Sequence, residues 1–148
     1  KLIDDIFTGA TINTPSMLCV EDYLFALDWA VSVGGLKGLM ARAQANAQAI
    51  WDFCDDRDWI DNLAIDFKTR SVTSVCLKFI DTSIKDPSAF AKAVVKRLEM
   101  EGAAFDIGSY RDAPAGLRIW CGATVETINI KTMLPWLEWA YQTELNAQ

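Results

Sequence analysis

The stretch Ser71-Val72-Thr73-Ser74-Val75-Cys76-Leu77-Lys78-Phe79-Ile80 alternates apolar and polar side chains and is rich in β-branched residues. A period of two with this composition predicts a strand. Shortly after it, Asp86-Pro87-Ser88 predicts the start of a helix, because proline suits the first helical turn. That helix is expected to continue through Leu98 to Gly102. A sheet that packs against helices is therefore indicated.

Two long helices are predicted before this strand. Apolar residues recur at helical spacing from Val20 to Val33, and Ser16 is the expected N-cap. Gly34-Gly35 is expected to stop or bend this first helix, because glycine readily adopts backbone conformations that end a helix. A second helix is predicted from Leu36 to Arg57, where strong helix formers predominate.

Shorter elements complete the pattern. Strands are expected at Leu63–Ile65, Phe105–Ile107 and Leu117–Cys121, and a last helix at Asn129–Leu145. The resulting order is two helices, two strands, a helix, two strands and a helix. This order predicts an α+β domain whose long helices pack on a small, mostly antiparallel sheet. Residues 1–19 fit poorly into that domain and are expected to reach from another one.

Composition excludes several classes of function. The 148 residues carry a net charge of −6 without a basic cluster, which argues against nucleic acid as a partner. The chain has no histidine, so Ser/His and Cys/His catalytic pairs and the commonest metal ligand are absent from it. No apolar run is long enough to span a membrane. No metal site is predicted.

The four cysteines, Cys19, Cys54, Cys76 and Cys121, lie far apart with no C-x-x-C spacing. Each lies in an apolar context, so they are expected to be buried, reduced thiols. Reduced thiols indicate a reducing compartment, and we expect a cytoplasmic protein.

Two loops could hold ligands. Thr11-Ile12-Asn13-Thr14-Pro15-Ser16 gathers hydroxyls and an amide just before a long helix, where a phosphate can bind. Composition alone favours an ordinary cap and turn. The second loop runs from Ser109 to Arg118 and places two arginines around Pro114 and Gly116. Arg118 should face opposite to Leu117 and Ile119. It could be a surface charge or a carboxylate clamp.

Longer motifs carry a family resemblance. The segment from Asn13 to Tyr23, the strand from Ser71 to Leu77, and Tyr110-Arg111-Asp112-Ala113-Pro114-Ala115-Gly116-Leu117-Arg118-Ile119-Trp120-Cys121-Gly122 together resemble the C-terminal part of phosphoserine aminotransferases. These are fold-type I, class-V enzymes that use pyridoxal 5'-phosphate. They transfer an amino group between phosphoserine and 2-oxoglutarate in serine biosynthesis.

The resemblance implies roles for five residues. Asn13 and Thr14 should help to hold the cofactor phosphate across a homodimer. Arg118 should bind the substrate α-carboxylate. Tyr110 and Arg111 match a loop that often binds the substrate phosphate, although many members have histidine where this chain has Tyr110.

The Schiff-base lysine of the family lies well upstream of the Asn13 motif, so no catalytic residue is expected in this chain. Residues 1–19 would then be an interface segment from the large domain, and residues 20–148 the small domain. The missing large domain and a second subunit would be its partners, and the chain alone should be inactive. Open alternatives are another class-V aminotransferase of the serine or alanine–glyoxylate type, or a non-catalytic α+β regulatory or oligomerisation module. A cysteine desulfurase is disfavoured, because none of the four cysteines lies in a Gly/Ser-rich loop.

Overall fold

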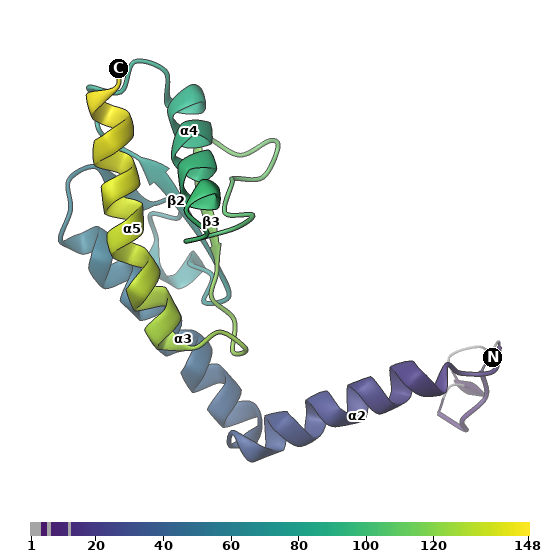
Figure 1. The fold of residues 1–148 in the computed structure, drawn as a ribbon. Coiled ribbons are helices and arrows are strands. Elements are labelled where there is room, and N and C mark those ends of the chain that lie inside the picture. Colours follow the sequence, from purple (N-terminus) through teal and green to yellow (C-terminus); the bar gives the residue numbers. More distant parts are fainter. Residues whose placement is uncertain (1–3, 6, 12) are drawn as a thin grey trace. The chain divides into compact units, whose positions relative to one another are not determined.

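A computed structural model describes residues 4, 5, 7–11 and 13–148. The chain forms two compact units, Lys1–Leu39 and Met40–Gln148, and helix α3 (Gly35–Asp55) runs through the boundary between them (Figure 1). These units reflect packing within the chain. The predicted division after residue 19 assigns residues 1–19 and 20–148 to two different domains of a longer protein. The two packing units do not test that assignment, which stays a prediction.

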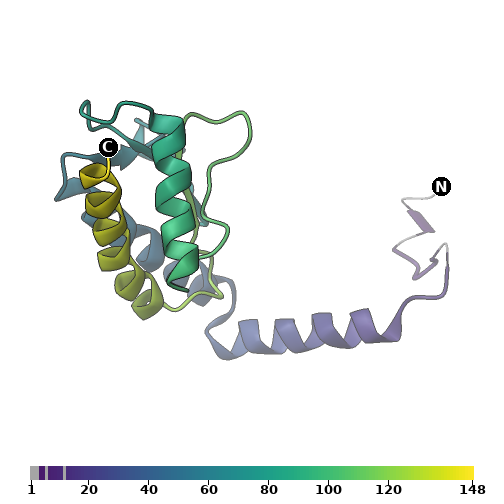
Figure 2. The same cartoon turned by 45° about the horizontal axis from the view of Figure 1, so that its top comes forward.

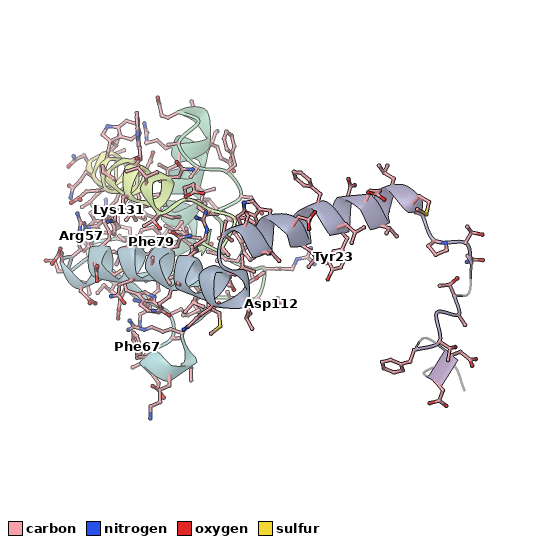
Figure 3. The ribbon with its side chains drawn as sticks, turned by 90° about the horizontal axis from the view of Figure 1, so that it is seen from below. Tyr23, Arg57, Phe67, Phe79, Asp112 and Lys131 are labelled. Atoms are coloured by element: carbon pink, nitrogen blue, oxygen red, sulfur yellow. The ribbon has the colours of Figure 1, made fainter. Side chains whose placement is uncertain are left out.

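The first unit contains helix α2 (Met17–Ser32), which begins three residues before the predicted Val20. The Ser16 side chain accepts a hydrogen bond from the backbone N–H of Cys19 at 3.5 Å, which confirms the predicted cap. The helix ends before Gly34 and Gly35, whose φ angles of 101° and 63° are disfavoured for other residues. None of the α2 side chains is buried, and Tyr23 projects freely from it (Figure 3).

The second unit is built on a three-stranded antiparallel sheet of order β1-β2-β3. Strand β1 (Ile60–Asn62) pairs with β2 (Ser74–Phe79), and β2 pairs with β3 (Gly116–Trp120). Because side chains alternate along a strand, the inner face gathers apolar residues that are almost fully buried. They are Ile60, Val75, Leu77, Leu117 and Ile119.

Three helices cover this inner face. The second half of α3, α4 (Pro87–Met100) and α5 (Thr127–Asn146) contribute to one continuous core with the sheet, and α4 and α5 lie side by side (Figures 1 and 2). Asp86 caps α4 by accepting hydrogen bonds from the N–H groups of Ser88 and Ala89, both at 3.0 Å. The predicted α+β architecture is confirmed.

Aromatic rings fill one part of this core. Trp59 stacks on Tyr141 with ring centroids 3.9 Å apart, and Phe90 meets both Tyr141 and Phe79 edge-on. Edge-to-face and stacked pairs add to the stabilisation that apolar burial already provides. This cluster joins β2, α4 and α5.

Two predicted strands are wrong. The strand expected at Leu63–Ile65 lies at Ile60–Asn62 instead, where the register with β2 is formed. The N–H of Leu63 makes one more bond to the carbonyl of Cys76, at 2.9 Å, but Ile65 is exposed and the pairing has ended. The strand expected at Phe105–Ile107 does not form. Asp106 has φ 53°, which breaks the extended backbone, and Gly108 alone makes an isolated bridge to Leu117. A short 3₁₀ helix, η1 (Phe67–Thr69), was not predicted.

The cysteines differ in exposure. Cys54 and Cys121 are buried and Cys76 is half-buried, as expected, but Cys19 is exposed on α2, so the prediction was wrong for that residue. Over the described residues, no three His, Cys, Asp or Glu side chains come together in a way that could hold a metal ion. In the same part of the chain, no single helix is long and apolar enough to cross a membrane, and α2 with α3 reaches that length and composition only as a bent pair.

Candidate functional site

Arg118 lies in the middle of β3, opposite Cys76 on β2. Its neighbours Leu117 and Ile119 are buried at 1% and 2% exposure in the core, so Arg118 projects from the other face of the sheet, as the alternation predicted. Its side chain is only 20% exposed. The strand therefore fixes a mostly buried guanidinium on the outer face of the sheet.

The guanidinium of Arg118 is contacted at Nη2, whereas its Nε donor has no partner among the described residues. Its Nη2 donates to the carboxylate of Asp106 at 3.2 Å and to the Asp106 carbonyl at 3.4 Å. The ring of Tyr110 lies 4.8 Å from the guanidinium carbon, a cation–π contact. The Nε atom is buried and finds no hydrogen-bond partner among the described residues. Arg118 therefore has an N–H group that is not used within the described residues and could donate to a ligand.

Gly116 allows β3 to approach β2 closely. A Cβ atom at this position would lie 2.0 Å from the carbonyl oxygen of Leu77, a distance that no side chain tolerates. Glycine is therefore required for the strand pairing that carries Arg118, two residues farther along. This explains physically why the loop ends in glycine.

Tyr110 and Arg111 lie in the loop between Gly108 and β3. Tyr110 packs on Arg118, whereas Arg111 is exposed and has no ion-pair partner within residues 13–148. A groove of about 480 Å³ lies between this loop and α4. Ser109 and Gly116 line it from the loop side, and Lys92 and Lys96 from the helix. The loop that carries Arg111 thus forms one wall of this groove, and Glu99 lies with the two lysines on the other wall.

Asn13 and Thr14 lie in the first unit, in the exposed segment before α2. Neither side chain has a hydrogen bond to the described residues, whereas Ser16 is used in capping α2. An exposed amide and hydroxyl at the start of a helix can donate to an anion. Ile12, between the two loop halves, lies outside the described residues.

The buried cysteines are not nucleophiles at neutral pH. Burial raises the pKa of Cys54 to about 12, assisted by the nearby carboxylate of Asp61. Burial likewise raises the pKa of Cys121 to about 11. Because a thiolate is the reactive form, both thiols are inert.

Sequence reasoning missed Asp106. It lies twelve positions before Arg118, outside any local motif, in a turn where Asp106 adopts positive φ. A strand was expected there, and extended alternation gives no reason to place that carboxylate beside Arg118. Only the pairing of Gly108 with Leu117 would have indicated the contact.

Comparison with known proteins identifies relatives of this chain by sequence. No family model matches the sequence. Phosphoserine aminotransferase of Methanosarcina mazei is 51% identical over 141 residues, 95% of this chain, and the enzyme of that name from Methanosarcina barkeri is 52% identical over the same length. The chain is a homologue of phosphoserine aminotransferases. It spans about 37% of the length of these two relatives.

The fold agrees with that relationship. A phosphoserine aminotransferase from Bacillus circulans superposes with a TM-score of 0.78 at 20% identity, over 94% of this chain and 36% of that structure. A pyridoxal-phosphate-bound phosphoserine aminotransferase from Trichomonas vaginalis superposes with a TM-score of 0.74 at 18% identity, over 90% of this chain and 36% of its own. These likenesses confirm the fold predicted for this part of a phosphoserine aminotransferase.

Proposed function

We propose that this chain is the small C-terminal domain, with an interface segment, of a phosphoserine aminotransferase. The longer enzyme would transfer an amino group between phosphoserine and 2-oxoglutarate, in serine biosynthesis. The observation that carries the proposal is the identity of 51–52% with two relatives of that name, over 95% of this chain. Since the chain spans about 37% of each relative, we assign the activity to the longer enzyme and only substrate binding to these residues.

Arg118 would bind the α-carboxylate of the substrate. Its planar fork matches two carboxylate oxygens, and strand β3 holds it in place. Nε is buried without a partner, and Tyr110 covers one face of the guanidinium. A carboxylate would therefore approach along the edge of the guanidinium, where its donors point. Arg111, exposed at the loop, would bind the phosphate of phosphoserine.

Asn13 and Thr14 fit the phosphate of pyridoxal phosphate as hydrogen-bond donors. Their side chains are exposed and have no hydrogen bond to other described residues. No charged side chain occurs from Thr11 to Ser16, so the charge of the phosphate would need to be balanced by other residues. When bound, the cofactor supplies the electron sink for transamination. The present residues would hold and orient its phosphate.

A second subunit and a large domain would cover α2. This helix exposes apolar side chains around its surface, including Leu18, Phe25 and Val31, which are 71–78% exposed. Exposed apolar surface of this kind marks a site of protein association. A homodimer would account for it. We place the enzyme in the cytoplasm, because the four cysteines are free thiols and a reducing compartment keeps them so.

The proposal is tested with the complete enzyme and with the chain alone. Arg118→Ala in the complete enzyme should raise the KM of both substrates about 10- to 100-fold, because hydrogen bonds to a charged group are lost. Arg118→Lys keeps the charge but not the fork and should recover only part of the loss. Arg111→Ala should slow the reaction of phosphoserine far more than that of serine.

The isolated 148-residue chain should show no transaminase activity and no absorbance from bound pyridoxal phosphate. Turnover by the purified chain, or unchanged substrate KM values in Arg118→Ala, would rule the proposal out.

A further inference from the structure

We propose that Asp106 is a displaceable carboxylate, which occupies Arg118 until the α-carboxylate of the substrate takes its place. This inference rests on the proposed role of Arg118 in substrate binding. It assigns to Asp106 a part in setting substrate affinity, although Asp106 itself does not touch the substrate.

The two partners of this ion pair differ greatly in exposure. The side chain of Arg118 is 20% exposed, whereas that of Asp106 is 93% exposed. One carboxylate oxygen of Asp106 meets one nitrogen of Arg118 at 3.2 Å. An exposed, single-contact pair of this kind contributes little to stability, because water solvates the carboxylate almost as well as arginine does. The carboxylate of Asp106 can therefore leave at small cost.

The backbone holds Asp106 beside Arg118 whether or not the ion pair forms. The N–H of Arg118 donates to the carbonyl of Ile107 at 2.8 Å, and Gly108 pairs with Leu117. These bonds fix the turn in which Asp106 takes φ 53°. A carboxylate tethered in this way competes with any free carboxylate for the same guanidinium.

Arg118 keeps its orientation after the carboxylate leaves. Its Nη2 also donates to the backbone carbonyl of Asp106 at 3.4 Å, and that carbonyl stays with the turn. Tyr110 continues to cover one face of the guanidinium. The edge vacated by Asp106, together with the unpartnered Nε, then matches the two oxygens of a substrate carboxylate.

Removal of the competing Asp106 carboxylate raises the apparent affinity of Arg118 for a substrate carboxylate. The size of the gain depends on the fraction of time for which Asp106 occupied the guanidinium. An exposed ion pair is weak, so the gain should be about two- to fivefold. The gain should be similar for both substrates, since each carries an α-carboxylate. It should appear in KM and leave kcat within about a factor of two, because Asp106 does not take part in the chemistry.

The experiment compares Asp106→Asn with Asp112→Asn in the complete enzyme. Asn tolerates positive φ well, so this change removes charge while keeping the turn. Asp112 is an exposed carboxylate of the same loop without an ion-pair partner in the described residues, so it controls for the change in net charge. The readouts are KM and kcat for both substrates and the Kd of glutarate, which has neither an amino nor a keto group.

Asp106→Asn should lower both KM values and the Kd of glutarate about two- to fivefold, while Asp112→Asn should leave them unchanged. Equal effects of the two variants, or weaker binding in Asp106→Asn, would overturn the inference. Asp106→Gly, which also suits positive φ, repeats the test if the asparagine variant unfolds. Arg118→Ala separates the two proposals. If this variant still binds glutarate normally, the proposed role of Arg118 is wrong. If it no longer binds glutarate, while Asp106→Asn matches its control, only the proposed role of Asp106 is wrong.

Discussion

The hydroxyl of Thr127 donates a hydrogen bond of 2.6 Å to the side-chain oxygen of Asn46, which is completely buried in α3. The amide of Asn46 also donates to the carbonyls of Cys121, Gly122 and Val125, at 2.8–3.2 Å. One side chain thereby provides a hydrogen-bond donor to three backbone carbonyls in the turn that joins β3 to α5. Arg42, one turn earlier on α3, donates to the carbonyl of Ala123 at 2.8 Å and supports the same turn.

We predict that Asn46→Leu lowers the free energy of unfolding by about 2–4 kcal/mol, because several buried polar groups lose their partner. Urea denaturation followed by fluorescence measures this. Asn129→Ala, at an exposed position near the start of α5, is the control and should change the free energy by less than about 0.5 kcal/mol. Equal effects of the two variants would contradict the importance of the network.

Gly116→Ala should disrupt the pairing of β2 and β3. The added methyl group would lie 2.0 Å from the carbonyl oxygen of Leu77, and neither strand can move without losing core contacts. We expect a loss of about 1–3 kcal/mol or more in the free energy of unfolding, as overpacking typically causes. Gly108→Ala is the control, since its Cβ would meet no atom within 4 Å. Thermal unfolding distinguishes the two, and a Gly116→Ala variant as stable as Gly108→Ala would refute the steric explanation.

The pair formed by Asp81 and Tyr141 predicts how stability depends on pH. The hydroxyl of Tyr141 and the backbone N–H of Ser83 donate to Asp81 and hold the pKa of that carboxyl below its usual 3.8. Its contribution is therefore complete above about pH 4 and is lost as the pH falls through the lowered value. Burial, and then the bond to Asp81, raises the pKa of Tyr141, so its contribution is complete below about pH 10 and is lost at higher pH.

Tyr141→Phe should flatten the stability profile at both ends, relative to the wild-type chain. Tyr23→Phe, which alters an exposed tyrosine of α2, should leave the profile unchanged. Melting temperatures between about pH 3 and 11 measure both. A Tyr141→Phe profile that runs parallel to that of Tyr23→Phe would show that this hydrogen bond does not govern the pH dependence.

Helices could be predicted from the sequence because their signals are local. Ser16 caps α2 as predicted, α4 begins at the predicted Pro87, and Gly34-Gly35 separates α2 from α3. Strands were predicted less well because pairing depends on distant residues. Nothing near Leu63 shows that β2 pairs with residues 60–62, and nothing near Phe105 shows that Asp106 adopts positive φ.

In the candidate site, too, features set by neighbouring residues could be predicted and features set by distant residues could not. The direction of Arg118 followed from alternation along one strand, and the structure confirms it. The roles of Asn13, Thr14, Tyr110, Arg111 and Arg118 in ligand binding stay predictions. Asp106 could not be found from sequence spacing, because its position depends on a bridge between Gly108 and Leu117.

The bridge between Gly108 and Leu117 also closes the base of the loop that precedes β3. The segment that carries Tyr110 and Arg111 leaves from Gly108 and returns at Gly116, next to Leu117, so both of its ends are anchored on the edge of β3. Residues between these anchors can be inserted, deleted or exchanged without altering the register of the sheet. Under the proposed function, a change in the length of this loop would change which distal group of an amino acid is recognised, while Arg118 stays in place.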